Sequence, residues 1–194
     1  MPTPEQRNHL REKVWKWRST KPIFIGDFWN DGPWVGGCIA GGRKYFHINA
    51  LGDIEPCVFI HFATDNIFDL WKKGKGLRDA IVSPFFMDIR KHQLTNDNWL
   101  TPCTIIDKPE FLREVVKTHN AHPTHKGAET IIQGEIADYL DKYARELDKI
   151  TRPEFEKMAK GEYDSSVVQL SIVMKNHREK NKKEYEIQNR GVEE

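Results

Sequence analysis

The feature that most restricts the fold of this chain is a pair of cysteines, Cys38 and Cys57, on either side of a turn signal at Gly52. Runs rich in β-branched and aromatic residues flank the turn in the order RKYFHIN, ALGD and IEPCVFIHF, which predicts a β-hairpin. A hairpin folds its strands back on each other about 4.8 Å apart, so we expect the two thiols to meet. Glycine tolerates the positive φ of a tight turn, which gives Gly52 a part in this pairing.

A third cysteine and a histidine extend the pair to a candidate ligand set. Cys103 follows Pro102 in a predicted extended loop, and His61 lies four residues after Cys57. Glycines surround Cys38 in the run GGCIAGG, where they leave room for a bulky inorganic group and offer N–H donors to its sulfides. Three cysteines and a histidine fit a metal ion or cluster better than a disulfide framework. Inert buried thiols are the alternative.

The segment before the first cysteine predicts a helix and a strand. A helix is expected over residues 4–19, and the apolar run at 23–25 predicts a buried strand. Asp27, Trp29 and Asn30 would then lie at the mouth of that strand, where barrel enzymes bind their substrates. The alternative is that these three residues cap the strand and form the turn after it.

The rest of the chain is predicted to be mainly helical. Residues 65–92 contain one or two helices, with Pro84 at a first-turn position, and another helix begins near Pro109. A long amphipathic helix is expected from about residue 128, and residues 152–194 predict a helix that frays into a disordered tail. Helices beside a small hairpin indicate the α+β class.

Several sequence blocks in this order carry a resemblance to a known family. They are GDFWNDG, VGGCIAGGRKYFHINALGDIEPCVFIHF, SPFFMDIRK, WLTPC and PEFLRE. Together they look like the carboxy-terminal part of radical S-adenosylmethionine enzymes that carry a SPASM or twitch extension. The spacing Cys-x13-Gly-x4-Cys falls within the first half of that extension's cysteine motif, and the resemblance covers roughly residues 1 to 130.

The resemblance implies a division of the chain into three regions. Residues 1–34 would be the last helix and strand of a partial barrel, and residues 35–120 would form the SPASM-like or twitch-like region that binds an auxiliary cluster. Residues 121–194 would be a helical extension that ends in the disordered tail.

The resemblance also implies a cofactor, an auxiliary iron–sulfur cluster of the [4Fe–4S] type with Cys38, Cys57 and Cys103 as thiolate ligands. Such clusters exchange electrons with a substrate radical or position the substrate. The family's catalytic CxxxCxxC is absent, so we expect no S-adenosylmethionine cleavage by this chain alone and assign no catalytic residue. The second cysteine-rich run of a full SPASM motif is also missing, which indicates the one-cluster, twitch-like form.

A structural zinc module is the second hypothesis for the same residues. Cys38, Cys57, Cys103 and His61 would form a Cys3His tetrahedron that serves protein interaction without a redox role. A domain without metal is the third hypothesis. In the cluster hypothesis the fourth ligand is not assigned: the candidates are His61, a water, a small ligand and a residue of a partner.

Charge and hydropathy bear on the partners. The chain has 30 Lys and Arg against 29 Asp and Glu, a net charge of +1, which indicates no nucleic-acid partner. Its apolar runs are shorter than the ~18 residues of a membrane span, and the amino terminus lacks the apolar core of a signal peptide. We therefore expect a cytoplasmic protein. The predicted helix and strand at the amino terminus would dock on a separately encoded radical S-adenosylmethionine barrel or on a second copy of the chain.

Overall fold

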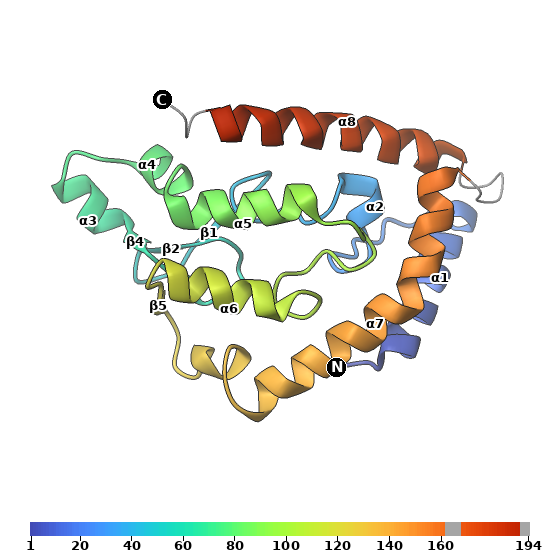
Figure 1. Ribbon diagram of the computed structural model, residues 1–194, viewed down its shortest axis with the longest axis horizontal. Coiled ribbons are helices and arrows are strands. Elements are labelled where there is room, and N and C mark those ends of the chain that lie inside the picture. The colour runs from blue at the N-terminus through green and yellow to red at the C-terminus, as the bar shows by residue number, and fades with distance from the viewer. Residues whose placement is uncertain (162–167, 191–194) are drawn as a thin grey trace.

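The computed structural model describes residues 1–161 and 168–190, which form helices around two small antiparallel sheets (Figure 1). The helices are α1 (Pro4–Thr20), α2 (Gly32–Val35), α3 (Ile67–Lys72), α4 (Leu77–Ile81), α5 (Pro84–Thr95), α6 (Pro109–Thr118), a 3₁₀ helix (Ala128–Ile131), α7 (Glu135–Lys160) and α8 (Val168–Arg190). The strands are β1 (His47–Ile48), β2 (Asp53–Glu55), β3 (Phe62–Ala63), β4 (Asp65–Asn66) and β5 (His122–Pro123). This is the α+β class that the sequence predicted. The described residues contain no closed barrel.

The sheets are much smaller than the predicted hairpin. One has the strand order β1-β2-β4 and the other pairs β3 with β5, all antiparallel. His47 lies opposite Glu55, and Gly52 in the connecting turn has φ +89°, the positive value expected there. Cys38 is not at the end of a hairpin strand, because it lies in the irregular segment that follows α2. Cys57 follows β2 and makes an isolated bridge to Ile60.

The strand predicted at residues 23–25 is wrong. This segment is irregular, and the side chain of Phe24 is 94% exposed. A strand needs a neighbour, but the guanidinium of Arg18 binds the carbonyl of Ile25 at 2.8 Å, and no described strand pairs with the segment. Residues 1–34 therefore contribute helices and an irregular segment, without the strand of an αβ unit.

Helix α1 begins with a capping box and buries an unusual face. The side chain of Thr3 accepts a hydrogen bond from the backbone of Gln6, and the side chain of Gln6 accepts one from the backbone of Thr3. The buried face carries two arginines, Arg7 and Arg11, beside the apolar Val14. Helix α1 lies beside α7 (Figure 1), and Arg11 pairs with Glu154 of α7, so buried charge is part of the contact between the two helices.

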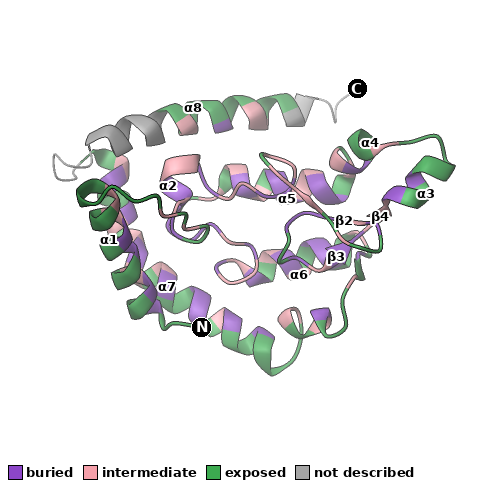
Figure 2. Ribbon diagram, turned by 180° about the vertical axis from the view of Figure 1, so that it is seen from behind, coloured by how far each residue is buried: buried purple, intermediate pink, exposed green. Residues whose placement is uncertain are grey.

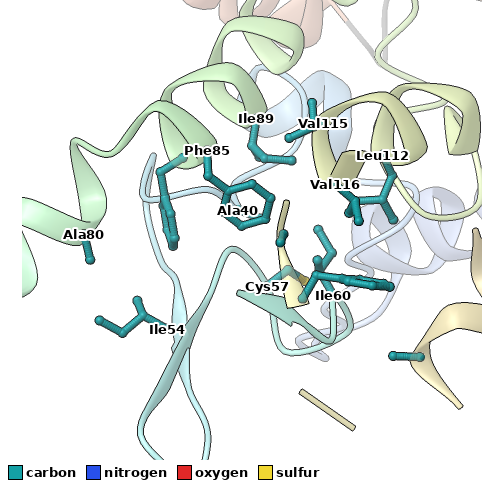
Figure 3. Packing of buried hydrophobic residues seen from close by; sticks show 14 of the residues in the cluster. Ala40, Ile54, Cys57, Ile60, Ala80, Phe85, Ile89, Leu112, Val115 and Val116 are labelled. Atoms are coloured by element: carbon teal, nitrogen blue, oxygen red, sulfur yellow. The ribbon is translucent and has the colours of Figure 1, made fainter. Parts of the chain in front are cut away.

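The main hydrophobic core lies between α5, α6 and the small sheets. Ser83 caps α5 at the boundary predicted before Pro84, and α6 begins at Pro109 as expected. Figure 3 shows the buried side chains of α5 and α6 converging on the loop that carries Cys57 and Ile60. Figure 2 shows that exposed residues dominate the outward faces of the surrounding helices. Cys57 is thus part of the main hydrophobic core.

The two long helices enclose this core. Helix α7 begins later than predicted, at Glu135, because Gly134 has φ +78° and interrupts the helical path. Helix α8 is helical from Val168 to Arg190, where the sequence predicted increasing disorder. The remainder of the predicted tail, residues 191–194, lies outside the described residues. No helix in the described ranges has an apolar stretch long enough to cross a bilayer.

Candidate metal centre

Three segments far apart in the sequence bring all three cysteines to one cavity. Cys38 comes from the irregular segment after α2, Cys57 from the loop after β2, and Cys103 from the loop between α5 and α6. The space that they line, here named the cysteine cavity, measures about 150 Å³. An apolar cavity of this size accepts a benzene-sized group. The remaining wall consists of Gly26, Asp27, Phe28, Trp29, Asp31, Val35, Gly37, Ile39, Tyr45, Phe59 and Pro102.

The glycine-rich segment around Cys38 is held by backbone contacts. The guanidinium of Arg43 donates hydrogen bonds to the carbonyls of Gly36 and Cys38. The N–H of Gly41 donates to the carbonyl of Pro56 at 2.8 Å, which joins this segment to the residue before Cys57. This contact, in place of a long hairpin strand, brings the first two thiols to the same cavity.

Cys57 is fixed by the core beneath it and by two polar contacts at its sulfur. Its carbonyl accepts the N–H of Ile60 at 2.9 Å, which closes a tight turn. The phenol oxygen of Tyr45 lies 2.7 Å from Cys57 Sγ, and the N–H of Phe59 lies 3.5 Å from the same atom.

Cys103 is positioned by a buried ion pair. The Asp107 carboxylate accepts the N–H of Cys103 at 2.9 Å and also contacts the guanidinium of Arg7 at 2.5 Å. Arg7 further donates to the carbonyl of Trp29 at 2.8 Å and to the Asn30 side chain at 3.3 Å. Arg7 therefore links α1, the turn on one side of the cavity and the loop that carries Cys103.

The charges of this pair support each other. Burial opposes the charged form of Arg7, but the adjacent Asp107 carboxylate more than offsets this, so the pKa of Arg7 is raised. Neither side chain is more than 5% exposed, which leaves the pair unscreened by solvent.

Two of the three thiols, Cys38 and Cys103, have raised pKa values in the metal-free chain. Burial raises the pKa of Cys38 to about 11, with a further contribution from the neighbouring Cys57. Burial also raises the pKa of Cys103, and the nearby Asp107 and Cys38 raise it further. A bound metal replaces the thiol protons, so loading of this site would release protons.

Helix α8 closes over the segment that carries Cys38. His177 donates from Nε2 to the carbonyl of Trp34 at 3.0 Å, and the Asn181 side chain donates to the carbonyl of Gly36 at 3.1 Å. Arg43 donates to the Asn181 oxygen at 3.0 Å. Together these contacts connect the carboxy-terminal helix to the site.

The structure does not place His61 with the three thiols. Its Nδ1 lies 3.7 Å from the buried Glu55 carboxylate, and its ring lies 5.3 Å from that of His125. Asp27 and Trp29 do line the cysteine cavity, although the strand expected before them is absent.

No group of three or more His, Cys, Asp or Glu residues has the geometry to hold one metal ion within residues 1–161 and 168–190. The four ligands of the predicted Cys3His tetrahedron are therefore not assembled in this arrangement. Three thiols that line one cavity remain as the candidate centre.

Sequence reasoning missed four residues that build the site: Tyr45, Arg7, Asp107 and Asn181. The helical spacing of Arg7 and Arg11 with Val14 was a signal, because it places two arginines on the face expected to be buried. No local pattern marks the other three, which act through partners distant in the sequence.

Comparisons with protein-family models, with curated proteins and with solved structures found no match. The function is therefore argued from the cysteine cavity and its surroundings.

Proposed function

We propose that this chain binds an iron–sulfur cluster of the [4Fe–4S] type through Cys38, Cys57 and Cys103. It would act as the auxiliary, electron-transferring or substrate-positioning module of a radical S-adenosylmethionine system. The observation that supports the proposal is the convergence of all three cysteines of the chain on one cavity of about 150 Å³.

The shared cavity of the three thiols favours a cluster over a single ion. The ligands of one zinc ion converge on a single point at about 2.3 Å each, and no such group is present among the described residues. The cysteines of a four-iron cluster bind different irons and surround a larger body. Three thiols that line one cavity match the arrangement that a cluster needs.

The wall of the cavity suits an electron-transfer centre. The rings of Trp29 and Phe59 pack at 5.4 Å and, with Phe28, form an apolar side of the cavity. Hydrogen bonds to the cysteine sulfurs and a low exposure to solvent are two features by which proteins tune such clusters. When bound, the cluster would supply one-electron transfer.

Three cysteines leave one iron of a four-iron cluster without a cysteine ligand. The two carboxylates of the wall are already engaged, since Asp27 accepts from Asn30 at 2.7 Å and Asp31 pairs with Arg18 at 2.5 Å. We infer that this position takes a small molecule or a group from a partner protein.

The partner in the proposal is a separately encoded radical S-adenosylmethionine barrel or a second copy of the chain. Ile23, Phe24 and Phe28 are 59%, 94% and 67% exposed in the segment that leads to the cavity. Apolar side chains this exposed are typical of surfaces that bind other proteins. A cytoplasmic location, where thiols stay reduced, belongs to the same proposal, and all three cysteines are free in the structure.

The test is anaerobic reconstitution with iron and sulfide, followed by measurement of iron, sulfide and zinc and by a visible absorption spectrum. We expect close to four irons and four sulfides per chain, with the broad visible absorption of a cluster. Cys38→Ser and Cys103→Ser should each lose most of this iron, while Ser83→Ala should retain it.

Two other results would contradict the proposal. Stoichiometric zinc in a colourless protein would replace the cluster with the zinc hypothesis. Full iron content in Cys38→Ser or Cys103→Ser would show that the ligands are assigned incorrectly. Circular dichroism of each variant separates a lost ligand from a lost fold.

A further inference from the structure

The hydroxyl of Tyr45 makes a direct contact with one of the proposed cluster ligands. Its oxygen lies 2.7 Å from Cys57 Sγ, and the side chain belongs to the wall of the cysteine cavity. The Tyr45 backbone is fixed as well, since its carbonyl accepts the N–H of Gly42 at 3.0 Å. The phenol is therefore held at the sulfur by the same glycine-rich segment that carries Cys38.

The direction of this hydrogen bond depends on the state of the cysteine. In the metal-free chain either group is able to donate. A metal-bound thiolate has no hydrogen, so the phenol O–H is then the donor.

We propose that Tyr45 is a positioning residue that donates a hydrogen bond to Cys57 Sγ and thereby makes the bound cluster easier to reduce. This inference rests on the proposed function. Reduction adds one electron to the cluster and increases the negative charge on its thiolates. A donor at the sulfur stabilises the more negative state more strongly, as charge-assisted hydrogen bonds do.

The electron balance of this step is simple. One electron enters from an external low-potential reductant, Tyr45 keeps its proton, and no bond between iron and sulfur is formed or broken. The N–H of Phe59, 3.5 Å from the same sulfur, is present with or without the phenol, so the Tyr45 contribution is measurable by itself.

The test is a potentiometric titration with dithionite of the reconstituted wild-type protein and of Tyr45→Phe, with the reduced cluster followed by electron paramagnetic resonance. We expect the two proteins to bind the same amount of iron. At a fixed potential the ratio of reduced to oxidised cluster should be about tenfold lower in Tyr45→Phe, a shift of ~59 mV for one electron.

Two further proteins sharpen the test. Tyr139→Phe removes a phenol from the exposed surface of α7, outside the cavity wall, and should leave the potential unchanged. Site-specific 3-fluorotyrosine at position 45 keeps the hydroxyl and makes it a stronger donor, so it should move the potential upward.

The outcomes distinguish this inference from the proposed function. A wild-type chain that binds no cluster would overturn both. Normal iron content with an unchanged potential in Tyr45→Phe would overturn the role of Tyr45 and leave the cluster in place. If Tyr45→Phe loses iron, its reduction potential cannot be compared with that of the wild type. The 3-fluorotyrosine protein then provides the test, and a reduction potential equal to that of the wild type would overturn the inference.

Discussion

The guanidinium of Arg7 and the carboxylate of Asp107 lie 2.5 Å apart with almost no exposure to solvent, although 100 positions separate them in the sequence. This pair holds the amino-terminal helix against the loop of Cys103. Its burial makes each charge dependent on the other, because a lone buried charge is costly.

We therefore expect Arg7→Met to destabilise the fold by about 3–5 kcal/mol, since it leaves the Asp107 carboxylate buried without its partner. Urea denaturation followed by circular dichroism measures the change. Lys72→Ala is the control: its pair with Asp69 is exposed, and its loss should not move the denaturation midpoint measurably. Equal midpoints for Arg7→Met and the wild type would contradict the stabilising role of the buried pair.

The turn glycine Gly52 is expected to resist substitution more strongly than an open glycine with the same backbone. Its φ is +89°, and an added Cβ would lie 2.6 Å from the ring of Phe68. Gly74 also has a positive φ, +69°, but nothing lies within 4 Å of its added Cβ. Gly74→Ala should lower the free energy of unfolding by about 1 kcal/mol, because alanine is strained at a positive φ. Gly52→Ala should lower it by about 1–3 kcal/mol more, because its Cβ also meets the ring of Phe68, so its total loss should be at least twice that of Gly74→Ala.

Thermal unfolding of the two glycine variants provides the comparison. Similar losses for both would mean that Phe68 moves aside without cost and that only the backbone conformation matters at Gly52.

The contact of α8 with the cysteine-bearing segment predicts a local effect of Asn181→Ala. Asn181 is 2% exposed, and its loss leaves the Gly36 carbonyl and one N–H of Arg43 without this partner, at a cost of about 1–3 kcal/mol. Hydrogen exchange measured by mass spectrometry should show faster exchange in α8 and in the segment around Cys38. Lys182→Ala, at the exposed neighbouring position, should leave both rates as they are. Unaltered exchange in Asn181→Ala would argue against coupling between α8 and the site.

We expect His92 to lower the free energy of unfolding in acid. Its ring stacks on Phe111 at 3.7 Å, and Nε2 is buried without a hydrogen-bond partner. Burial, with a smaller effect of Lys108, lowers the pKa of His92 to about 4. The unfolded chain takes up a proton near pH 6.5, whereas the folded chain does so only near pH 4. Stability from this residue is thus complete above pH 6.5 and is lost as the pH falls towards 4.

The size of this loss is about 3 kcal/mol, from roughly 2.5 pH units at 1.36 kcal/mol each. Urea denaturation at a series of pH values measures it. His92→Phe keeps an aromatic ring against Phe111 but cannot take up a proton, so its stability should depend less on pH in this window. The same pH dependence in both proteins would assign the effect to other groups.

The sequence predicted the features that depend on adjacent residues. A turn with positive φ at Gly52, the start of α5 after Ser83 and the start of α6 at Pro109 follow from local backbone preferences, and the structure has all three. Capping and turn formation involve groups only a few residues apart, so these elements were readable without the fold.

The tertiary structure alone decided which distant groups meet. Residues 23–25 have the composition of a strand but lack a neighbour to pair with, so they are irregular, and Ile23 and Phe24 are exposed. Cys38 reaches the cavity of Cys57 through the contact of Gly41 with Pro56 and not along a hairpin strand.

The same division holds for the site. Cysteine identity and count, which the sequence determined, suggested a shared centre for the three thiols. The positions of Tyr45, Arg7 and Asp107 around that centre depend on packing between segments up to 100 positions apart. Such contacts carry no local signature, because their energy comes from burial and from partners that only the folded chain brings together.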